Sequence, residues 1–267
     1  MSTVLDIPYS TASPLLQFDV YTPESAPPRS PVLVFVRGGA WRADDKSAHR
    51  DFATTLVAAT NCPVLVPNYR LTTDTNDFRH PAHAEDVLAF LVFLSTWPGV
   101  PGVLQPAARP WYLMGHSAGA HILTSIFLDA SAIYPSLTPP ASVVQAVRGI
   151  VMTEGIYDID MCLARFPAYR DWFLAAAFGD RPSYADCATT RLPKRDGSAL
   201  SWLVVHSKGD TLVDMPQSDA IYTHLCAIYG DATVARKFDQ LDVEHDDVMH
   251  SPLFIDMVRS FVDRLQS

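Results

Sequence analysis

The sequence predicts an α/β fold in which helices cover a mostly parallel central sheet. Two apolar runs, 32–36 and 111–114, are continuous rather than alternating, as expected of strands buried on both faces of a parallel sheet. Segments with the apolar spacing of helices separate these runs from later ones, and this alternation of strand and helix is typical of α/β domains. We therefore expect the functional residues in loops at the carboxyl ends of the strands.

The predicted elements follow one another along the chain. The first is an edge strand at 16–20, where Leu16, Phe18 and Val20 alternate with more polar residues. A segment with four prolines in nine residues, 23–31, follows as a loop. The later strands are expected at 32–36, 62–66, 111–114, 147–153, 200–205 and 234–238, the helices at 47–60, 81–97, 118–128, 216–229 and 252–265, and further loops at 98–110 and 131–142.

Residues 154–199 depart from this alternation. The stretch is rich in aromatic residues and contains two short helical patterns. The whole chain has 267 residues, which is within the range of a single α/β domain. We expect one domain over 1–267, in which 154–199 forms a small cap-like insertion over the functional site.

Composition and charge argue against nucleic-acid and membrane partners. The chain carries 20 Lys and Arg against 29 Asp and Glu, a net charge of −9, and its basic residues are scattered. Binding to nucleic acid or anionic lipid needs a concentrated positive patch. The longest uncharged apolar run, 87–94, is too short to span a bilayer, and the N-terminus lacks a signal-peptide pattern. We expect a soluble, cytoplasmic protein, with the oligomeric state left open and a homodimer as one option.

No metal-binding pattern is present among the cysteines and histidines. No two cysteines form a C-x-x-C pair, so we expect reduced and mostly buried thiols. His80 and His83 lack a nearby third ligand and are expected to be solvated residues at the start of a helix. We therefore predict neither a metal nor an organic cofactor. The four cysteines are Cys62, Cys162, Cys187 and Cys226.

Ser117 is a candidate nucleophile. The run from Gly115 to Gly119 matches G-x-S-x-G, in which a sharp strand-to-helix turn strains the serine backbone and exposes its hydroxyl. The apolar run before it and the helical pattern after it give the required context. This combination is typical of the α/β-hydrolase fold, which is the fold that we predict.

A second informative site follows the strand at 32–36. Enzymes of this fold bind the oxyanion of the tetrahedral intermediate with two backbone N–H groups. One belongs to the residue after the nucleophile, here Ala118, and the other comes from a Gly-rich loop after an early strand. Gly38 and Gly39 lie where that loop is expected.

The acid and the base are expected in the chain order Ser, Asp or Glu, His. Asp210 follows the strand at 200–205 and His245 follows the strand at 234–238, so both lie in loops at the carboxyl ends of strands. Asp214 and His250 remain the alternatives for the two roles. We expect His206 to pack beneath the site and His116 to belong to the turn itself.

Several short motifs are spread along the chain from about Val32 to His245. They are Gly38-Gly39-Ala40-Trp41, Tyr69-Arg70-Leu71 with Pro81-Ala82, Gly115 to Gly119, Gly155-Ile156-Tyr157-Asp158, Phe166-Pro167-Ala168-Tyr169, Ala177-Phe178-Gly179-Asp180, His206 to Asp210 and His245-Asp246-Asp247. Together they resemble the kynurenine formamidases, especially the fungal arylformamidases, within the hormone-sensitive-lipase-like esterases. The more specific part of the similarity is 154–180.

The resemblance implies hydrolysis of N-formyl-L-kynurenine to L-kynurenine and formate, a step of tryptophan breakdown toward NAD. It assigns Ser117 as nucleophile, Asp210 as acid and His245 as base, with the oxyanion bound at Gly38 and Gly39. The aniline leaving group needs aromatic walls, which Trp41, Tyr157 or Trp172 could form.

One position departs from the family. Arg37 precedes the two glycines where the family usually has His. We hypothesise that this residue braces the loop, because the oxyanion donors are backbone groups. Two other interpretations stay open: a small-acyl carboxylesterase of the same fold, and a ligand-binding homologue without catalysis.

Overall fold

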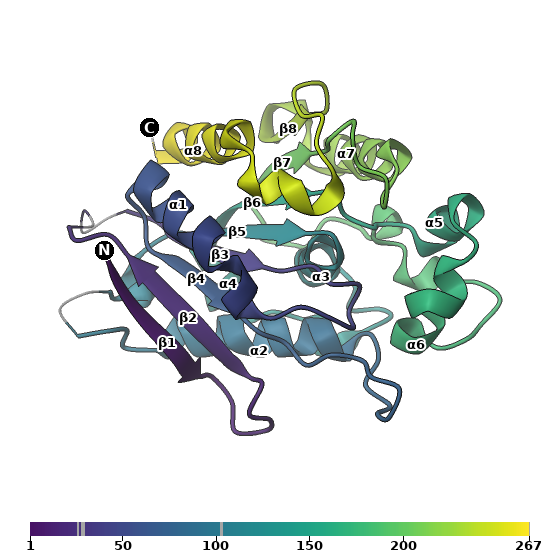
Figure 1. Cartoon of the computed structure of the whole chain (residues 1–267), viewed down its shortest axis with the longest axis horizontal. Helices are drawn as coiled ribbons and strands as arrows, with labels where there is room; N and C mark the ends of the chain where they lie inside the picture. The colour runs from purple at the N-terminus through teal and green to yellow at the C-terminus, as the bar shows by residue number, and fades with distance from the viewer. Residues whose placement is uncertain (26, 28–29, 102–103, 267) are drawn as a thin grey trace.

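One sheet of eight strands organises the described part of the chain, in the order β1-β2-β4-β3-β5-β6-β7-β8 (Figure 1). The computed structural model describes residues 1–25, 27, 30–101 and 104–266, so parts of the predicted loops 23–31 and 98–110 lie outside it. The strands are β1 Ser2–Pro8, β2 Gln17–Thr22, β3 Val32–Val36, β4 Val64–Pro67, β5 Trp111–His116, β6 Val147–Thr153, β7 Ser201–Val205 and β8 Val234–Lys237.

The predicted fold class is confirmed. Every strand pair from β4 and β3 through β8 is parallel, and the antiparallel pairs are β1 with β2 and β2 with β4. The helices are α1 Arg50–Thr60, α2 Ala82–Thr96, α3 Ala118–Phe127, α4 Ala141–Ala146, α5 Ile159–Arg165, α6 Ala175–Phe178, α7 Met215–Tyr229 and α8 Pro252–Gln266.

The strand side chains divide the core into two layers. On β3, Val34 belongs to the cluster that α2, α3 and α7 cover, whereas Leu33 and Phe35 belong to the cluster under α1 and α8. Successive strand residues point to opposite faces, so a continuous apolar run fills both layers. The parallel strands end at one edge, where α5 and α6 lie beyond the carboxyl end of β5 (Figure 1).

The prediction of an edge strand at 16–20 is wrong. β2 pairs on one side with β4 and on the other with β1, so Phe18, Val20 and even Tyr21 are buried. β1 is the edge strand, and its residues are mostly exposed. A mostly exposed strand has no apolar pattern of its own, which is why the sequence did not reveal it.

Residues 154–199 enter between β6 and β7. They contain α5, α6, a π-helical turn at Arg170–Leu174 and two short 3₁₀ turns. Backbone hydrogen bonds attach this insertion to the rest of the chain, from His80 N to Ala177 O (2.8 Å) and from Asp129 N to Pro193 O (2.8 Å). We call residues 154–199 the cap.

The cysteines and the paired histidines lie inside the protein. All four cysteines are free thiols, and Cys226 alone is partly exposed. The expectation that His80 and His83 are solvated is wrong: both ring nitrogens of His80 are buried, and His83 is fully buried. Burial lowers the pKa of both imidazoles, that of His83 to about 3. The Nε2 of His83 lies 3.0 Å from Thr72 Oγ1. Among the described residues, no helix is long and apolar enough to cross a membrane.

Candidate active site

Ser117 lies at the sharp turn between β5 and α3. Its backbone angles, φ 52° and ψ −120°, fall in a region that non-glycine residues rarely occupy. The turn is tight because α3 starts directly against β3: a Cβ on Gly119 would stand 2.1 Å from the Val36 carbonyl oxygen. Strain of this kind persists where the surrounding packing imposes it, and here it exposes the serine to a cavity.

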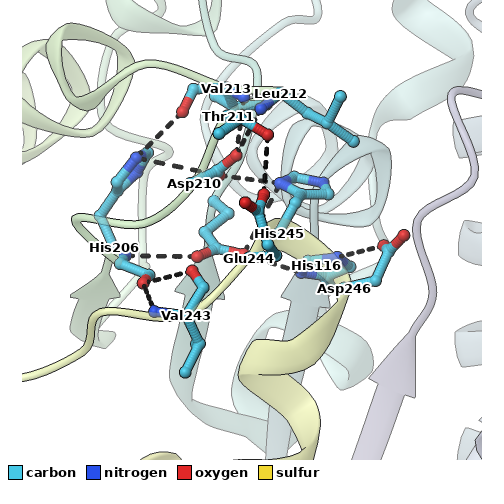
Figure 2. A network of polar contacts seen from close by, with 12 residues as sticks. His116, His206, Asp210, Thr211, Leu212, Val213, Val243, Glu244, His245 and Asp246 are labelled. Carbon is cyan, nitrogen blue, oxygen red and sulfur yellow. Dashed lines mark hydrogen bonds and ion pairs between the residues drawn. The ribbon is translucent and has the colours of Figure 1, made fainter.

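Asp210 and His245 are paired. The Nδ1 of His245 donates to Asp210 Oδ2 at 2.8 Å, and both side chains are buried (Figure 2). The other carboxyl oxygen, Oδ1, accepts the backbone N–H groups of Leu212 (2.8 Å) and Val213 (2.9 Å). Burial alone would raise the Asp210 pKa, but these hydrogen bonds and the charge of His245 outweigh it and lower the pKa. Asp210 is therefore a carboxylate at neutral pH.

The pair faces Ser117 across a shared cavity. Ser117 and His245 both line it, and the bond to Asp210 leaves Nε2 of the imidazole for the serine. In the described part of the chain no hydrogen bond joins Ser117 Oγ to His245. Hydrogen bonds of this kind are often long in unliganded enzymes and shorten when substrate binds.

The alternatives named from the sequence lie elsewhere. Asp214 precedes α7 as its capping residue, and His250 is exposed at the end of the 3₁₀ turn His245–His250. His206 is buried, with Nδ1 2.8 Å from Ser218 Oγ and Nε2 3.1 Å from the Val213 carbonyl. These contacts hold the loop that carries Asp210.

The predicted oxyanion loop directly follows β3. Gly39 has φ 91° and lines the cavity beside Ser117, whereas Gly38 lies behind it, against the Ser117 side chain. Ala118 is the first residue of α3, so its N–H has no acceptor within the helix. Ala118 directly follows Ser117, and the glycine loop lies against that serine, as expected of oxyanion donors.

Arg37 holds this loop from beneath. It is 1% exposed, and its guanidinium donates to the carbonyl oxygen of Ala43 (2.8 Å), to Asn68 Oδ1 (3.0 Å) and to the Tyr69 carbonyl (3.3 Å). The guanidinium also lies 4.3 Å from the centre of the Tyr69 ring. Arg37 does not line the cavity, so its contacts fit the bracing role expected of it.

The cavity has a volume of about 370 Å³ and an aromatic wall from the cap. Its described lining contains one permanent cation, Arg42, and one aspartate, Asp246. The lining residues are Gly39, Ala40, Arg42, Ala43, Ser117, Ile156, Tyr169, Trp172, Phe173, Leu212, Val213, His245 and Asp246.

The structure corrects the predicted aromatic wall at two positions. Trp172 lines the cavity as expected, but Trp41 and Tyr157 are completely buried and do not. Trp41 packs behind the wall against Phe173 and Phe178. Tyr157 turns into the core below the cap, where a Cβ on Gly155 would stand 2.4 Å from its ring. Tyr169 and Phe173 take their places at the cavity.

Glu154, the first residue of the cap, is a neighbour of His245 that the sequence did not indicate. Its side chain is 0% exposed, and its Oε2 lies 3.6 Å from Nδ1 of His245. Burial and the charge of Asp210 raise its pKa to about 10, so this carboxyl is neutral at pH 7. No motif marks it, because the contact depends on β6, β7 and β8 lying side by side in the sheet.

His116, inside the nucleophile motif, is also close to these groups. It is 2% exposed, its Nε2 is 3.6 Å from Asp246 Oδ1, and burial lowers its pKa to about 4 (Figure 2).

Among described residues, two groups place metal-ligand atoms within 4.8 Å of one another: His116 with His245 and Asp246, and Glu154 with Asp210 and His245. Both groups contain His245, whose Nδ1 already donates to Asp210.

Comparison with known proteins shows the family. A kynurenine formamidase from Meyerozyma guilliermondii is 29% identical over 200 residues, which cover 73% of this chain and 71% of that protein. The kynurenine formamidase avaC from Aspergillus versicolor is 26% identical over 253 residues, covering 82% and 84%. Esterase B from Lactobacillus rhamnosis shares the fold, with a TM-score of 0.77, 16% identity and coverage of 99% and 85%. A family model described as BD-FAE matches residues 18–225. Because this match covers more than half of the chain, the protein belongs to the BD-FAE family and is a hydrolase with the α/β-hydrolase fold.

Proposed function

We propose that the protein hydrolyses the formamide bond of N-formyl-L-kynurenine through a formyl-enzyme intermediate on Ser117. The proposal is carried by one cavity in which Ser117 and His245 meet an aromatic wall. Support for the substrate comes from the two relatives named kynurenine formamidase, which match most of this chain. The products are L-kynurenine and formate.

The first half of the reaction forms the intermediate. Nε2 of His245 takes the proton of Ser117 Oγ, which attacks the formyl carbon. The N–H of Ala118 and an N–H of the Gly38-Gly39 loop donate to the resulting oxyanion. The C–N bond then breaks as the imidazolium returns its proton to the aniline nitrogen, and L-kynurenine leaves.

The second half restores the enzyme. Water gives a proton to His245 and attacks the formyl ester, formate leaves, and Ser117 regains its proton. Asp210 accepts the Nδ1–H of His245 throughout, so the imidazole keeps the tautomer whose Nε2 can act as a base. Ser117, His245 and water carry out every proton transfer in these steps.

The charges of the cavity fit an amino-acid leaving group. L-Kynurenine carries an aromatic ring, an α-carboxylate and an α-ammonium. Tyr169, Trp172 and Phe173 can pack against the ring, and Arg42 is placed to receive the carboxylate. Two of the five N–H donors of Arg42 already bond to the Trp172 carbonyl and to exposed Asp74, which leaves three for a ligand.

The test is kcat/KM of the purified protein on N-formyl-L-kynurenine and on p-nitrophenyl acetate, with Ser117→Ala alongside. We expect the formamide to be the better substrate and both activities to fall at least about 10³-fold in the variant. Good ester turnover with a slow formamide would favour a small-acyl esterase. Tight binding of N-formyl-L-kynurenine without any turnover would favour a binding protein.

A further inference from the structure

Two carboxyl groups flank one nitrogen of His245. Asp210 Oδ2 lies 2.8 Å from Nδ1, and Glu154 Oε2 lies 3.6 Å from the same atom. The first comes from the loop after β7 and the second from the end of β6. A single N–H forms a short hydrogen bond with one carboxyl at a time, so the orientation of His245 needs only one of them.

Glu154 is held firmly in this place. Its Oε1 accepts the backbone N–H of Ser207 at 3.2 Å, and its own N–H donates to the Val205 carbonyl at 3.2 Å. Its φ is 54°, a value that a glutamate adopts only where its surroundings require it. Within the described residues, Oε2 is buried and has no hydrogen-bond partner. A firmly held side chain thus directs an unpaired carboxyl oxygen toward His245.

The surroundings of Glu154 explain why it is protonated while Asp210 is charged. Two adjacent buried carboxylates repel each other, so one of them keeps its proton. The Asp210 carboxylate accepts three hydrogen bonds, whereas the Glu154 carboxyl accepts one. The charged or titratable groups that face Glu154 are Asp210 from the loop after β7, His245 and Asp246 from the turn after β8, His116 from β5, and Tyr157 from the cap.

We propose that Glu154 is a positioning residue and a reserve acid, which orients His245 when Asp210 is not a carboxylate. The inference rests on the proposed triad. Without the charge of Asp210, Glu154 loses the main neighbouring charge that opposes its ionisation. It then releases its proton to solvent and accepts the Nδ1–H of His245, which requires Oε2 to move from 3.6 Å to about 2.8 Å. Nε2 stays free to take the Ser117 proton.

The test uses four forms of the full-length protein: wild type, Asp210→Asn, Glu154→Gln and the double variant. Both substitutions keep the size of the side chain, and melting temperatures check that each variant is folded. The kcat on N-formyl-L-kynurenine and on p-nitrophenyl acetate is measured for all four. Replacement of the orienting acid in a serine protease lowers kcat by about 10⁴.

We expect Glu154→Gln alone to lower kcat far less than Asp210→Asn does, because Asp210 already orients His245 in the wild type. Asp210→Asn should lower kcat by about 10² to 10³, and the double variant should lose at least about a further tenfold. Asp247→Asn is the matched control, since Asp247 is exposed in the turn that carries His245 and does not line the cavity. When this control substitution is added to Asp210→Asn, kcat should fall by less than when Glu154→Gln is added.

The pH profile separates positioning from mere structural support. In Asp210→Asn, the active form has Glu154 ionised, so kcat should rise with pH through the Glu154 pKa, and the double variant should lack that rise. A double variant equal to Asp210→Asn, with the same pH profile, would overturn the reserve-acid inference alone. If Asp210→Asn and the double variant both keep the wild-type rate, the proposed triad and this inference both fail.

Discussion

The nucleophile turn and the cap face the same cavity, but the protein holds them in different ways. Every residue of α3 after Ser117 is buried, and the turn contacts β3 so closely that it has no room for one methyl group at Gly119. The cap wall is looser: Phe173 is 3% exposed and Trp172 is 56% exposed. From this difference we expect a division of work, in which residues held by the sheet carry out the reaction and the cap binds the substrate.

The largest effect is expected where the turn is tightest. In Gly119→Ala the new Cβ would stand 2.1 Å from Val36 O and 2.6 Å from Arg37 O, both backbone atoms that cannot rotate away. We expect kcat on formamide and ester to fall together by at least about 10³, and unfolding free energy to fall by about 2–3 kcal/mol. Kinetics and urea denaturation measure the two quantities.

Gly197→Ala is the matched control. Gly197 lies in the cap segment with φ 73° and no atom within 4 Å of a new Cβ, so only its backbone angle opposes the substitution. We expect unfolding free energy to fall by about 1 kcal/mol and kcat to stay unchanged. Equal losses in the two variants would show that close contact between α3 and β3 is not what holds the nucleophile.

A smaller effect should follow removal of the brace. Arg37→Ala removes the buried guanidinium donors of the carbonyl oxygens of Ala43 and Tyr69. Since this loosens the oxyanion loop, we expect kcat to fall by about 10- to 100-fold on both substrates, with little change in KM. Arg37→His should change turnover of N-formyl-L-kynurenine by less than about tenfold, or 1.4 kcal/mol. A rise beyond tenfold would mean that residue 37 positions the substrate.

The contrast between the sheet and the cap also explains which parts of the site could be predicted from the sequence. The turn around Ser117 and the loop at Gly38-Gly39 are short segments whose glycines are required by local sterics, so a few adjacent residues reveal them. Asp210 and His245 could be predicted because the order of the strands determines which loops meet. The positions of all these residues are set by the strands of the sheet and the turns that follow them.

Features that depend on packing between distant segments could not be predicted. Trp41 follows the glycine loop directly, and whether it faces the cavity or the core is decided by Phe173 and Phe178, far along the chain. Glu154 contacts His245 only because β6, β7 and β8 lie side by side in the sheet. A single sequence contains no signal for contacts of this kind.

The next effect is expected at Arg42, which bonds to the Trp172 carbonyl of the cap, and it should depend on the substrate. Arg42→Met keeps the length of the side chain and removes its charge. We expect KM for N-formyl-L-kynurenine to rise about tenfold with kcat nearly unchanged, since a partly exposed charge-assisted hydrogen bond contributes about 1.5 kcal/mol. Formanilide, which has the same formamide and no carboxylate, should bind as well to the variant as to the wild type.

The control for Arg42 is its exposed partner. Asp74→Asn removes the ion pair while the guanidinium stays, and Asp74 is 87% exposed. Because exposed ion pairs contribute about 0–1 kcal/mol, we expect stability to change little and KM for the formylated amino acid to fall slightly. A rise in KM for formanilide in Arg42→Met would instead mean that Arg42 shapes the cap.

The smallest effect is expected at Trp172, and it tests whether the cap wall acts on binding alone. The indole is more than half exposed and contacts the rings of Tyr169 and Phe173. Trp172→Ala should therefore leave unfolding free energy within about 0.5 kcal/mol and raise KM for N-formyl-L-kynurenine about threefold, as expected for loss of one aromatic contact. Phe173→Ala, in the buried part of the same wall, should lose about 3 kcal/mol of stability. If Trp172→Ala lowers kcat as Arg37→Ala does, the cap takes part in the chemistry, and the division between sheet and cap is wrong.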